Sequence, residues 1–214
     1  MVLKRFVILA NSKKYQEHCV AGIDLENGEW IRIINNQNAE KQYAIRDEDL
    51  ICDCGKKAKV LDIVEVECEK CGADHPTAYY QPENYAMSQD IPWKKVGQFP
   101  ISNLVNHLST KLKLWYGGYD RVYPNQLKDD LAPYSLIFIK PEDVKFYLDE
   151  REKPRTDFKY RGSNYRRLAI TDPAYEYNLD KYPENENYGY VLSLGGLYGA
   201  NPAHFKLISQ IFKL

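Results

Sequence analysis

Short apolar segments recur along this chain, and each is bounded by Gly, Asn or Pro or by a run of polar residues. The first three are residues 4–10, 18–25 and 30–34, with Asn27-Gly28 between the last two. An Asn-Gly pair between two strand-like segments is typical of a β-hairpin. The pattern therefore predicts short β-strands joined by tight turns, and it argues against a fold built on long helices.

Further strands are expected at residues 59–67, 134–139, 144–148, 155–162, 166–171 and 188–194. Residues 205–212 fit a strand or a helix, and we predict a strand. One segment changes period: the apolar residues from Leu104 to Leu112 recur at helical spacing, and Ser102 can cap their start. About ten short strands with one helix are typical of β-barrels and β-sandwiches.

The charge balance narrows the class of protein. The chain carries 29 Lys and Arg against 30 Asp and Glu, a net charge of −1, which excludes a uniformly basic nucleic-acid coat but allows a local basic patch. No apolar run reaches the ~18–20 residues of a membrane span. The N-terminal residues lack the features of a secretory signal peptide, so we expect a cytoplasmic protein. The 18 Tyr and 3 Trp against 2 Met also favour β structure.

Several blocks of the sequence resemble a known family. They are Ala10 to Lys13, Cys19 to Asp24, Gly28 to Arg32, Val60 to Glu65, Gln81 to Tyr85, Leu168 to Asp172, Leu192 to Gly195 and Phe205 to Ile208. Together these blocks resemble the dual OB-fold-containing domain, a family of small prokaryotic proteins suspected of roles in nucleic-acid-linked conflict systems. The resemblance covers nearly the whole chain.

The resemblance implies a mostly β protein made of two OB-like β-barrels with one linking helix. Together with the strand pattern, it predicts an N-terminal barrel with cysteine-bearing loops over residues 1–101, the helix over 102–114 and a C-terminal barrel over 115–214. The family has no established catalytic residues, so the resemblance implies a binding role more than a reaction. The chain departs from the family pattern by placing four cysteines around the strand at 59–67.

These four cysteines lie in two close pairs, Cys52 with Cys54 and Cys68 with Cys71, and each pair is followed by glycine. Four thiolates on two tight turns can complete the tetrahedron of a structural zinc ion. A straight strand over residues 59–67, however, would hold the pairs about 27–30 Å apart at ~3.3 Å per residue. A shared structural zinc and free thiols in two loops both stay open.

Residues 151–167 carry seven basic side chains against two acidic ones, with aromatic residues between them. Basic side chains neutralise phosphates and aromatic rings stack on bases, so the segment predicts a single-strand nucleic-acid site on an OB barrel. The alternative is a solvated strand edge protected by charge and neutralised by the acidic residues at 172–186. The candidate binding residues are Arg155, Lys159, Tyr160, Arg161, Tyr165, Arg166 and Arg167.

Two further groups of candidate nucleic-acid-binding residues lie in the first half of the chain. Trp30 and Arg32 share one face of a strand, where they could clamp a nucleotide, although a core Trp with an Arg that reaches the edge is favoured. Lys13 and Lys14 follow the strand at 4–10 and could bind phosphate, or they form only a polar turn.

Motifs of common enzyme classes are absent from the sequence, including the zinc deaminase signature, Gly-x-Ser-x-Gly and the Walker A loop. Asp130, Asp143 and Lys145 have the order of a metal-dependent nuclease site, but such a pattern arises by chance among so many acidic residues. The sequence therefore leaves catalysis open and favours a protein that binds RNA or single-stranded DNA, and the family resemblance implies a place in a prokaryotic defence system. The alternatives are a protein-interaction or scaffold module and a metal-dependent nuclease.

Overall fold

Side chains of β4 (Asp62–Lys70) alternate between the interior and the surface. Asp62, Val64, Val66 and Cys68 are buried, and the residues between them are partly exposed. A strand with one buried face covers only one side of a core, so other strands must cover the remaining sides. The first half of the chain achieves this by closing its sheet into a barrel.

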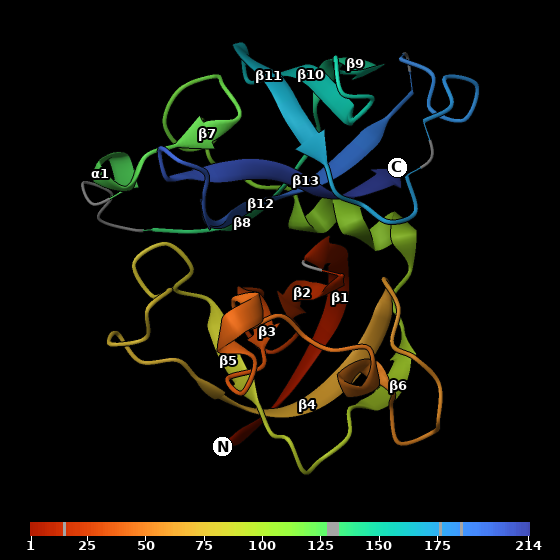
Figure 1. The fold of residues 1–214 in the computed structure, drawn as a ribbon. Helices are drawn as coiled ribbons and strands as arrows, with labels where there is room; N and C mark the ends of the chain where they lie inside the picture. Colours follow the sequence, from red (N-terminus) through yellow and green to blue (C-terminus); the bar gives the residue numbers. More distant parts are fainter. Residues whose placement is uncertain (15, 128–132, 176, 185) are drawn as a thin grey trace. The chain divides into compact units, whose positions relative to one another are not determined.

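The structure is a computed structural model that describes residues 1–14, 16–127, 133–175, 177–184 and 186–214. The chain divides into two units, Met1–Leu104 and Val105–Leu214 (Figure 1). The expected domain boundaries at residues 101 and 115 bracket this division. Each unit has its own sheet and its own hydrophobic core. No helix in the described part of the chain is both long and apolar enough to cross a membrane.

The first unit contains a closed barrel with the strand order β1-β2-β3-β5-β4 and back to β1. Besides β4, the barrel strands are β1 (Val2–Lys14), β2 (Glu17–Asp24), β3 (Trp30–Ile34) and β5 (Asn84–Met87). The edge strand β6 (Lys94–Gln98) also pairs with β4. β1 closes the barrel because its first half pairs with β4 and its second half pairs with β2. β3 and β5 run parallel, whereas the other pairs are antiparallel.

The second unit repeats this strand order with an interrupted first strand. The sheet order is β8-β12-β13-β11-β10-β9, and its strands are β8 (Leu136–Ile139), β9 (Glu142–Leu148), β10 (Pro154–Tyr160), β11 (Ser163–Ile170), β12 (Tyr188–Tyr198) and β13 (Ala203–Lys213). β8 pairs with β12 and β9 pairs with β10, and only Lys140 and Pro141 separate β8 from β9 in the chain. Pro141 has no N–H group for the ladder, so it marks the interruption.

β8 and β9 thus take the place of β1, and β10 to β13 take the places of β2 to β5. The parallel pairing of β11 with β13 matches that of β3 with β5. Five-stranded Greek-key barrels of this kind are OB folds. The expected fold class, a mostly β protein with two OB-like barrels, is confirmed, and so is the strand predicted at 205–212.

The linking helix differs from the expectation over residues 102–114. The chain forms a 3₁₀ helix, η3 (Ile101–His107), and residues 108–114 are not helical. The side chains of the second barrel explain the early end, because Tyr160 Oη donates to the carbonyl groups of Ser109 and Lys111 and Leu114 N donates to Tyr165 Oη. The remaining short elements are η1 (Ala39–Lys41), η2 (Glu48–Leu50), β7 (Arg121–Val122), which pairs with β13, and α1 (Pro124–Leu127).

Closure of the first barrel leaves no room for a side chain at Gly22 of β2, where a Cβ atom would lie 1.8 Å from the carbonyl oxygen of Val7. We expect Gly22→Ala to lower the free energy of unfolding by about 1–3 kcal/mol, because the strands must move apart. Gly97→Ala is the matched control, since a Cβ there meets nothing closer than 3.6 Å. Urea unfolding followed by circular dichroism would check this, and equal midpoints for the two variants would contradict it.

Candidate functional site

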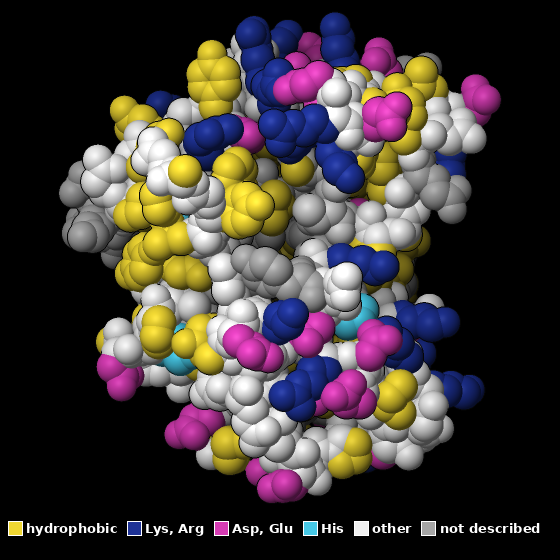
Figure 2. All heavy atoms as spheres, viewed as in Figure 1, with side chains coloured by type: hydrophobic (Ala, Val, Ile, Leu, Met, Phe, Trp, Pro, Cys, Tyr) yellow, Lys and Arg dark blue, Asp and Glu magenta, His cyan; other side chains and the backbone are white. Residues whose placement is uncertain are grey.

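OB barrels bind oligonucleotides and oligosaccharides on the outer face of their second and third strands and on the loops that join strands one to two and four to five. In the second unit these strands are β10 and β11, and the loops are residues 149–153 and 199–202. Figure 2 shows Lys and Arg side chains gathered over this part of the unit, with Asp and Glu side chains among them. This face is therefore the candidate site.

The alternation along β10 separates charged side chains from the core. The buried residues are Thr156, Phe158 and Tyr160, and the residues between and before them are Arg155, Asp157 and Lys159. Because successive side chains of a strand point to opposite faces, the charged residues lie on the outer face.

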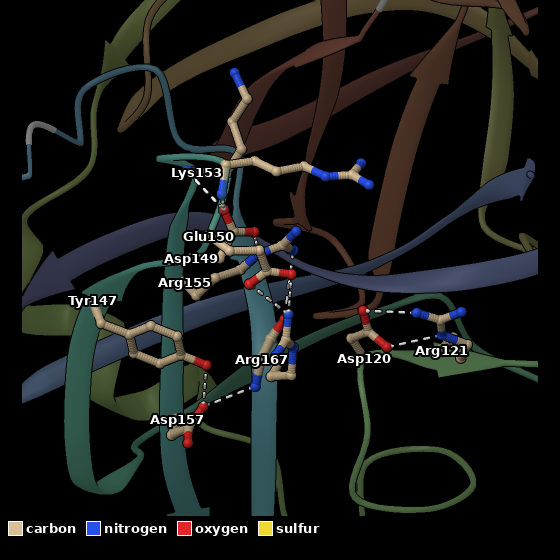
Figure 3. A network of polar contacts seen from close by, with 10 residues as sticks. Asp120, Arg121, Tyr147, Asp149, Glu150, Lys153, Arg155, Asp157 and Arg167 are labelled. Carbon is tan, nitrogen blue, oxygen red and sulfur yellow. Dashed lines mark hydrogen bonds and ion pairs between the residues drawn. The ribbon is translucent and has the colours of Figure 1, made fainter.

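Three of the basic residues on this face are paired with carboxylates from β9 and the loop that follows it. Arg155 Nε lies 2.8 Å from Asp149, Lys159 Nζ lies 2.6 Å from Asp143, and Arg167 Nη2 lies 3.1 Å from Glu150. The pairs made by Arg155 and Arg167 lie side by side in Figure 3. In the described part of the chain, the carboxylates paired with these three residues thus come from residues 143–150, whereas the sequence suggested residues 172–186.

Asp149 organises this network. Its carboxylate accepts hydrogen bonds from the backbone N–H groups of Lys153 and Arg151, each at 2.9 Å, and from the guanidinium of Arg155 (Figure 3). The backbone hydrogen bond from Lys153, followed by the bond from Arg155, lowers the pKa of Asp149 to about 2. Asp149 therefore stays ionised at neutral pH and fixes both the loop at 149–153 and the Arg155 side chain.

Other cations of the segment are available for a ligand. Within the described residues, the exposed side chains of Arg151, Lys153 and Arg166 make no ion pair. Arg161 instead lies over the Tyr160 ring and donates to Tyr160 Oη and to the Ser109 carbonyl. The face thus combines cations that are fixed by carboxylates with cations that are open to solvent.

Tyr160 and Tyr165 point into the barrel rather than to its outer face, where the sequence predicted that they would stack on bases. They are 4% and 3% exposed and belong to the core of the second barrel. The reason is again the period of the strand, because Tyr160 shares the inner face with Phe158, and the rings of Phe158 and Tyr165 stack at 5.4 Å. Their hydroxyl groups bind the backbone of residues 109–114 instead of a base.

The exposed aromatic side chains beside this face come from a segment that the sequence reasoning missed. The loop at residues 116–120 lies between β11 and β13: Arg166 N donates to Gly118 O at 2.9 Å, and Lys206 N donates to Asp120 O at 2.8 Å. Glycine is needed at 118, because a Cβ atom there would lie 2.4 Å from the Asn164 carbonyl oxygen. The tract from Trp115 to Tyr119, two glycines among three aromatic residues, was the signal available.

This loop borders a groove of about 470 Å³ on the second unit. The groove is lined by Tyr116, Gly117, Tyr119, Asp120, Arg121, Tyr123, Gln126 and Arg167. Figure 3 shows the pair of Asp120 and Arg121 near Arg167. Arg167 of β11 thus belongs both to the charged face and to the groove.

A buried lysine of β13 holds the loop at residues 116–120 against the barrel. Lys206 of β13 is fully buried, and its Nζ donates to the carbonyl oxygens of Tyr116 at 2.8 Å and Gly117 at 2.6 Å. Burial lowers the pKa of Lys206 from 10.5 to about 8, with an opposing effect from Asp120. The ammonium group therefore donates to two loop carbonyl groups, but its charged form is destabilised because it is removed from water.

In the first unit, the corresponding outer face of β2 and β3 is covered rather than open. Arg32 is only 3% exposed, and its guanidinium lies 3.4 Å from Glu83 Oε1 and 2.7 Å from Cys19 Sγ. Glu83 and Tyr80, both buried, belong to the long connection between β4 and β5. Arg32 is therefore enclosed by its own barrel and is not exposed to a nucleotide, which corrects its assignment as a binding residue.

The other candidates of the first unit give a mixed result. Trp30 is half-buried at the start of β3, and Lys13 is exposed near the end of β1. The side chain of Lys14 lies outside the described residues. In the described residues, neither Trp30 nor Lys13 makes an ion pair or ring contact that would join it to a charged site. Their role as binding residues stays a prediction.

The four clustered cysteines do not form a metal-binding group in the structure. Cys52 and Cys68 lie in the hydrophobic core of the first barrel, whereas Cys54 is exposed and Cys71 is half-buried. Burial raises the pKa of Cys68 to about 12 and also raises that of Cys52, which disfavours the thiolate form that zinc requires. Across the described ranges, no three His, Cys, Asp or Glu side chains are grouped as metal ligands. Zinc binding stays a prediction, which metal analysis of the purified protein would test.

The nuclease pattern gains no support from the described residues. The carboxylate of Asp143 is exposed and pairs with Lys159 at 2.6 Å, so it faces a cation rather than a second carboxylate. Asp130 lies outside the described residues.

One comparison with known proteins agrees with the topology. A family model described as the dual OB-containing domain matches residues 4–211, nearly the whole chain, and confirms the resemblance found in the sequence. A solved structure of a murine DNA-binding protein bound to double-stranded DNA matches over 100% of both chains, with 7% identity and a TM-score of 0.36, which is too distant to support an inference. The curated proteins give no match.

The burial of Lys206 should make the free energy of unfolding depend on pH. Because its pKa falls from 10.5 to about 8 on folding, the unfolded chain keeps a proton that the folded chain has lost between these pH values. The free energy of unfolding therefore rises with pH between about 8 and 10.5. Below about pH 8 the buried ammonium is charged, and its burial destabilises the fold to the full extent. We expect the wild type to gain about 1–2 kcal/mol relative to Lys206→Met between pH 8 and 9.5.

Urea unfolding at several pH values would measure this difference. Taking the difference between the two proteins cancels the titration of tyrosines and cysteines that both contain. Lys213→Met, at a half-exposed lysine of the same strand, is the control for loss of a lysine side chain. Parallel pH profiles for wild type and Lys206→Met would contradict the prediction.

Proposed function

We propose that this chain, which belongs to the dual OB-containing domain family, binds RNA or single-stranded DNA on the outer face of β10 and β11. One observation carries the proposal: exposed cations lie on the strands and the loop that OB barrels use for ligands. OB barrels also bind oligosaccharides, but a surface with this many Lys and Arg side chains favours a polyanion.

The ion pairs on this face are compatible with phosphate binding. The Lys159–Asp143 and Arg167–Glu150 pairs are both exposed to solvent. Exposed pairs of this kind contribute little to stability because water screens them, so a phosphate can replace the carboxylate at little cost. The Arg155–Asp149 pair is more buried and better bonded, and we assign it to the structure of the loop.

The finer parts of the proposal rest on the family resemblance. We propose that the protein acts in the cytoplasm as part of a prokaryotic defence system, where RNA or single-stranded DNA would be its ligand. Identification of nucleic acid recovered with the protein from cells would test both the ligand and the setting.

Loss of an open or exchangeable cation should weaken binding without changing base preference. We expect Arg166→Ala and Arg167→Ala each to lower affinity several-fold for every sequence and to reduce the slope of log affinity against log salt by about 1. Fluorescence anisotropy with single-stranded RNA and DNA at low and moderate salt would measure both quantities.

Lys213→Ala is the matched control, because Lys213 is a half-exposed lysine at the far end of β13 and pairs with Glu186. Its affinity and salt slope should equal those of the wild type. The proposed function is contradicted by a wild type that binds no oligonucleotide at low salt.

Removal of a competing carboxylate should have the opposite effect. Both oxygens of Glu150 lie close to Arg167 Nη2, at 3.1 and 3.2 Å, where a phosphate would compete with them. We expect Glu150→Gln to raise affinity several-fold at low salt, because it frees Arg167 and removes one negative charge. The same anisotropy titration checks this, and an unchanged or lower affinity would count against it. Glu186→Gln, beside Lys213, is the control for a mere change of net charge.

A protein partner is the second candidate function. It is favoured by exposed apolar side chains on the first unit, where Met1, Val2 and Leu3 border a cleft with Tyr85. Contiguous apolar surface of this kind marks interaction sites in many proteins. A wild type that ignores nucleic acid but captures a defined partner would favour this function instead.

A further inference from the structure

The groove beside β11 presents two tyrosine side chains to solvent. Tyr116 is 63% exposed and Tyr119 is 68% exposed, and both line the groove. By contrast, Tyr160, Tyr165 and Tyr190 of the same unit are buried in its core. Burial of a large ring stabilises a fold, and Tyr116 and Tyr119 forgo that stabilisation because they stay exposed. Two exposed rings in one groove therefore indicate a binding role, for which the rings must be accessible.

The backbone that carries these rings is fixed to the barrel. Lys206 Nζ binds the carbonyl groups of Tyr116 and Gly117, Arg166 N binds Gly118, and Lys206 N binds Asp120. The loop is thus bonded to β11 on one side and to β13 on the other. A ligand that meets rings on a fixed backbone loses less entropy of ordering on binding.

The charges around the groove suit phosphates that flank stacked groups. Arg121 and Arg167 line it, with 47% and 54% of their side chains exposed, and Asp120 is the one acidic residue among the described residues of the lining. Arg121 lies over the ring of Phe205 at 5.1 Å while it also pairs with Asp120 at 3.0 Å. Among the described lining residues, two arginines lie with one carboxylate, and the exposed Glu150 pairs with Arg167 where a phosphate could replace it.

We propose that this groove binds unpaired nucleobases, which stack on Tyr116 and Tyr119 while Arg121 and Arg167 bind the adjoining phosphates. The inference rests on the proposed function and narrows it to a single-stranded ligand. Base faces are free in single strands but covered in a duplex, so a site made of ring faces and cations selects the single strand. Every base has such a face, so little base preference is expected.

The test uses the full chain and a single-stranded oligonucleotide that contains 2-aminopurine, whose fluorescence falls when it stacks on an aromatic ring. We expect the wild type to quench this fluorescence and to bind the single strand at least ten-fold more tightly than the matched duplex. Tyr116→Ala and Tyr119→Ala should each lower affinity about 5- to 100-fold with little change in salt slope. Tyr116→Trp and Tyr119→Trp should keep both affinity and quenching.

Tyr177→Ala is the matched control, because Tyr177 is 42% exposed on the same unit and does not line the groove. It should bind like the wild type. The quenching by wild-type protein needs no variant, so a folding defect in an alanine variant cannot decide the result.

The possible failures are distinct. If the wild type binds the oligonucleotide without quenching, or if both alanine variants bind as tightly as Tyr177→Ala, the stacking groove is wrong while the proposed function stands. Equal affinity for duplex and single strand would also reject the groove as a single-strand site. If the wild type binds no oligonucleotide, both proposals fail.

Discussion

The first unit depends on one strand, β1, that pairs with both β4 and β2 and thereby closes a barrel. In the second unit β8 and β9, separated by Lys140 and Pro141, make the equivalent pairings with β12 and β10. Closure removes most open edges and gives every strand one inner and one outer face. On β10 this rule places Phe158 and Tyr160 inside and Arg155 and Lys159 outside, so the same constraint builds both the core and the charged surface.

The two barrels use the equivalent outer face in different ways. In the first, Arg32 is enclosed with Glu83 and Cys19 beneath the connection between β4 and β5. A buried charge needs such a partner, and removing the partner would leave an uncompensated ion. In the second, the pairs are exposed and exchangeable, as that of Arg167 with Glu150 shows. The open face is therefore the better candidate for a polyanion, and the closed face belongs to the structure of its barrel.

Local patterns predicted the architecture well, because strands and hairpins leave short-range signals. The two-residue period, the Asn-Gly turn and the spacing of Pro and Gly identify β-strands, and family resemblance identified the barrels. The predicted helix over 102–114 is too long. Apolar spacing does not reveal that Tyr160 and Tyr165 form hydrogen bonds with the backbone of residues 109–114. A long-range contact overrides a local preference here.

The site was only partly predictable for the same reason. The charge of residues 151–167 is visible in the sequence, but whether an interleaved tyrosine faces the core depends on the register of the strand. Tyr160 and Tyr165 face inward, and the exposed rings are Tyr116 and Tyr119, from a loop placed beside β11 through Lys206 and Arg166. Nothing within residues 115–120 indicates this placement, since it depends on bonds to strands far along the chain.

We propose that the open face and the groove of the second barrel together form the nucleic-acid interface. The most direct measurement is an amide chemical-shift map of the full chain during titration with a single-stranded oligonucleotide. We expect the largest changes at residues 116–121, 149–155 and 163–167, with smaller changes at β3 and in the connection between β4 and β5. Changes concentrated around Arg32 and Glu83, with residues 116–121 unaffected, would contradict the claim.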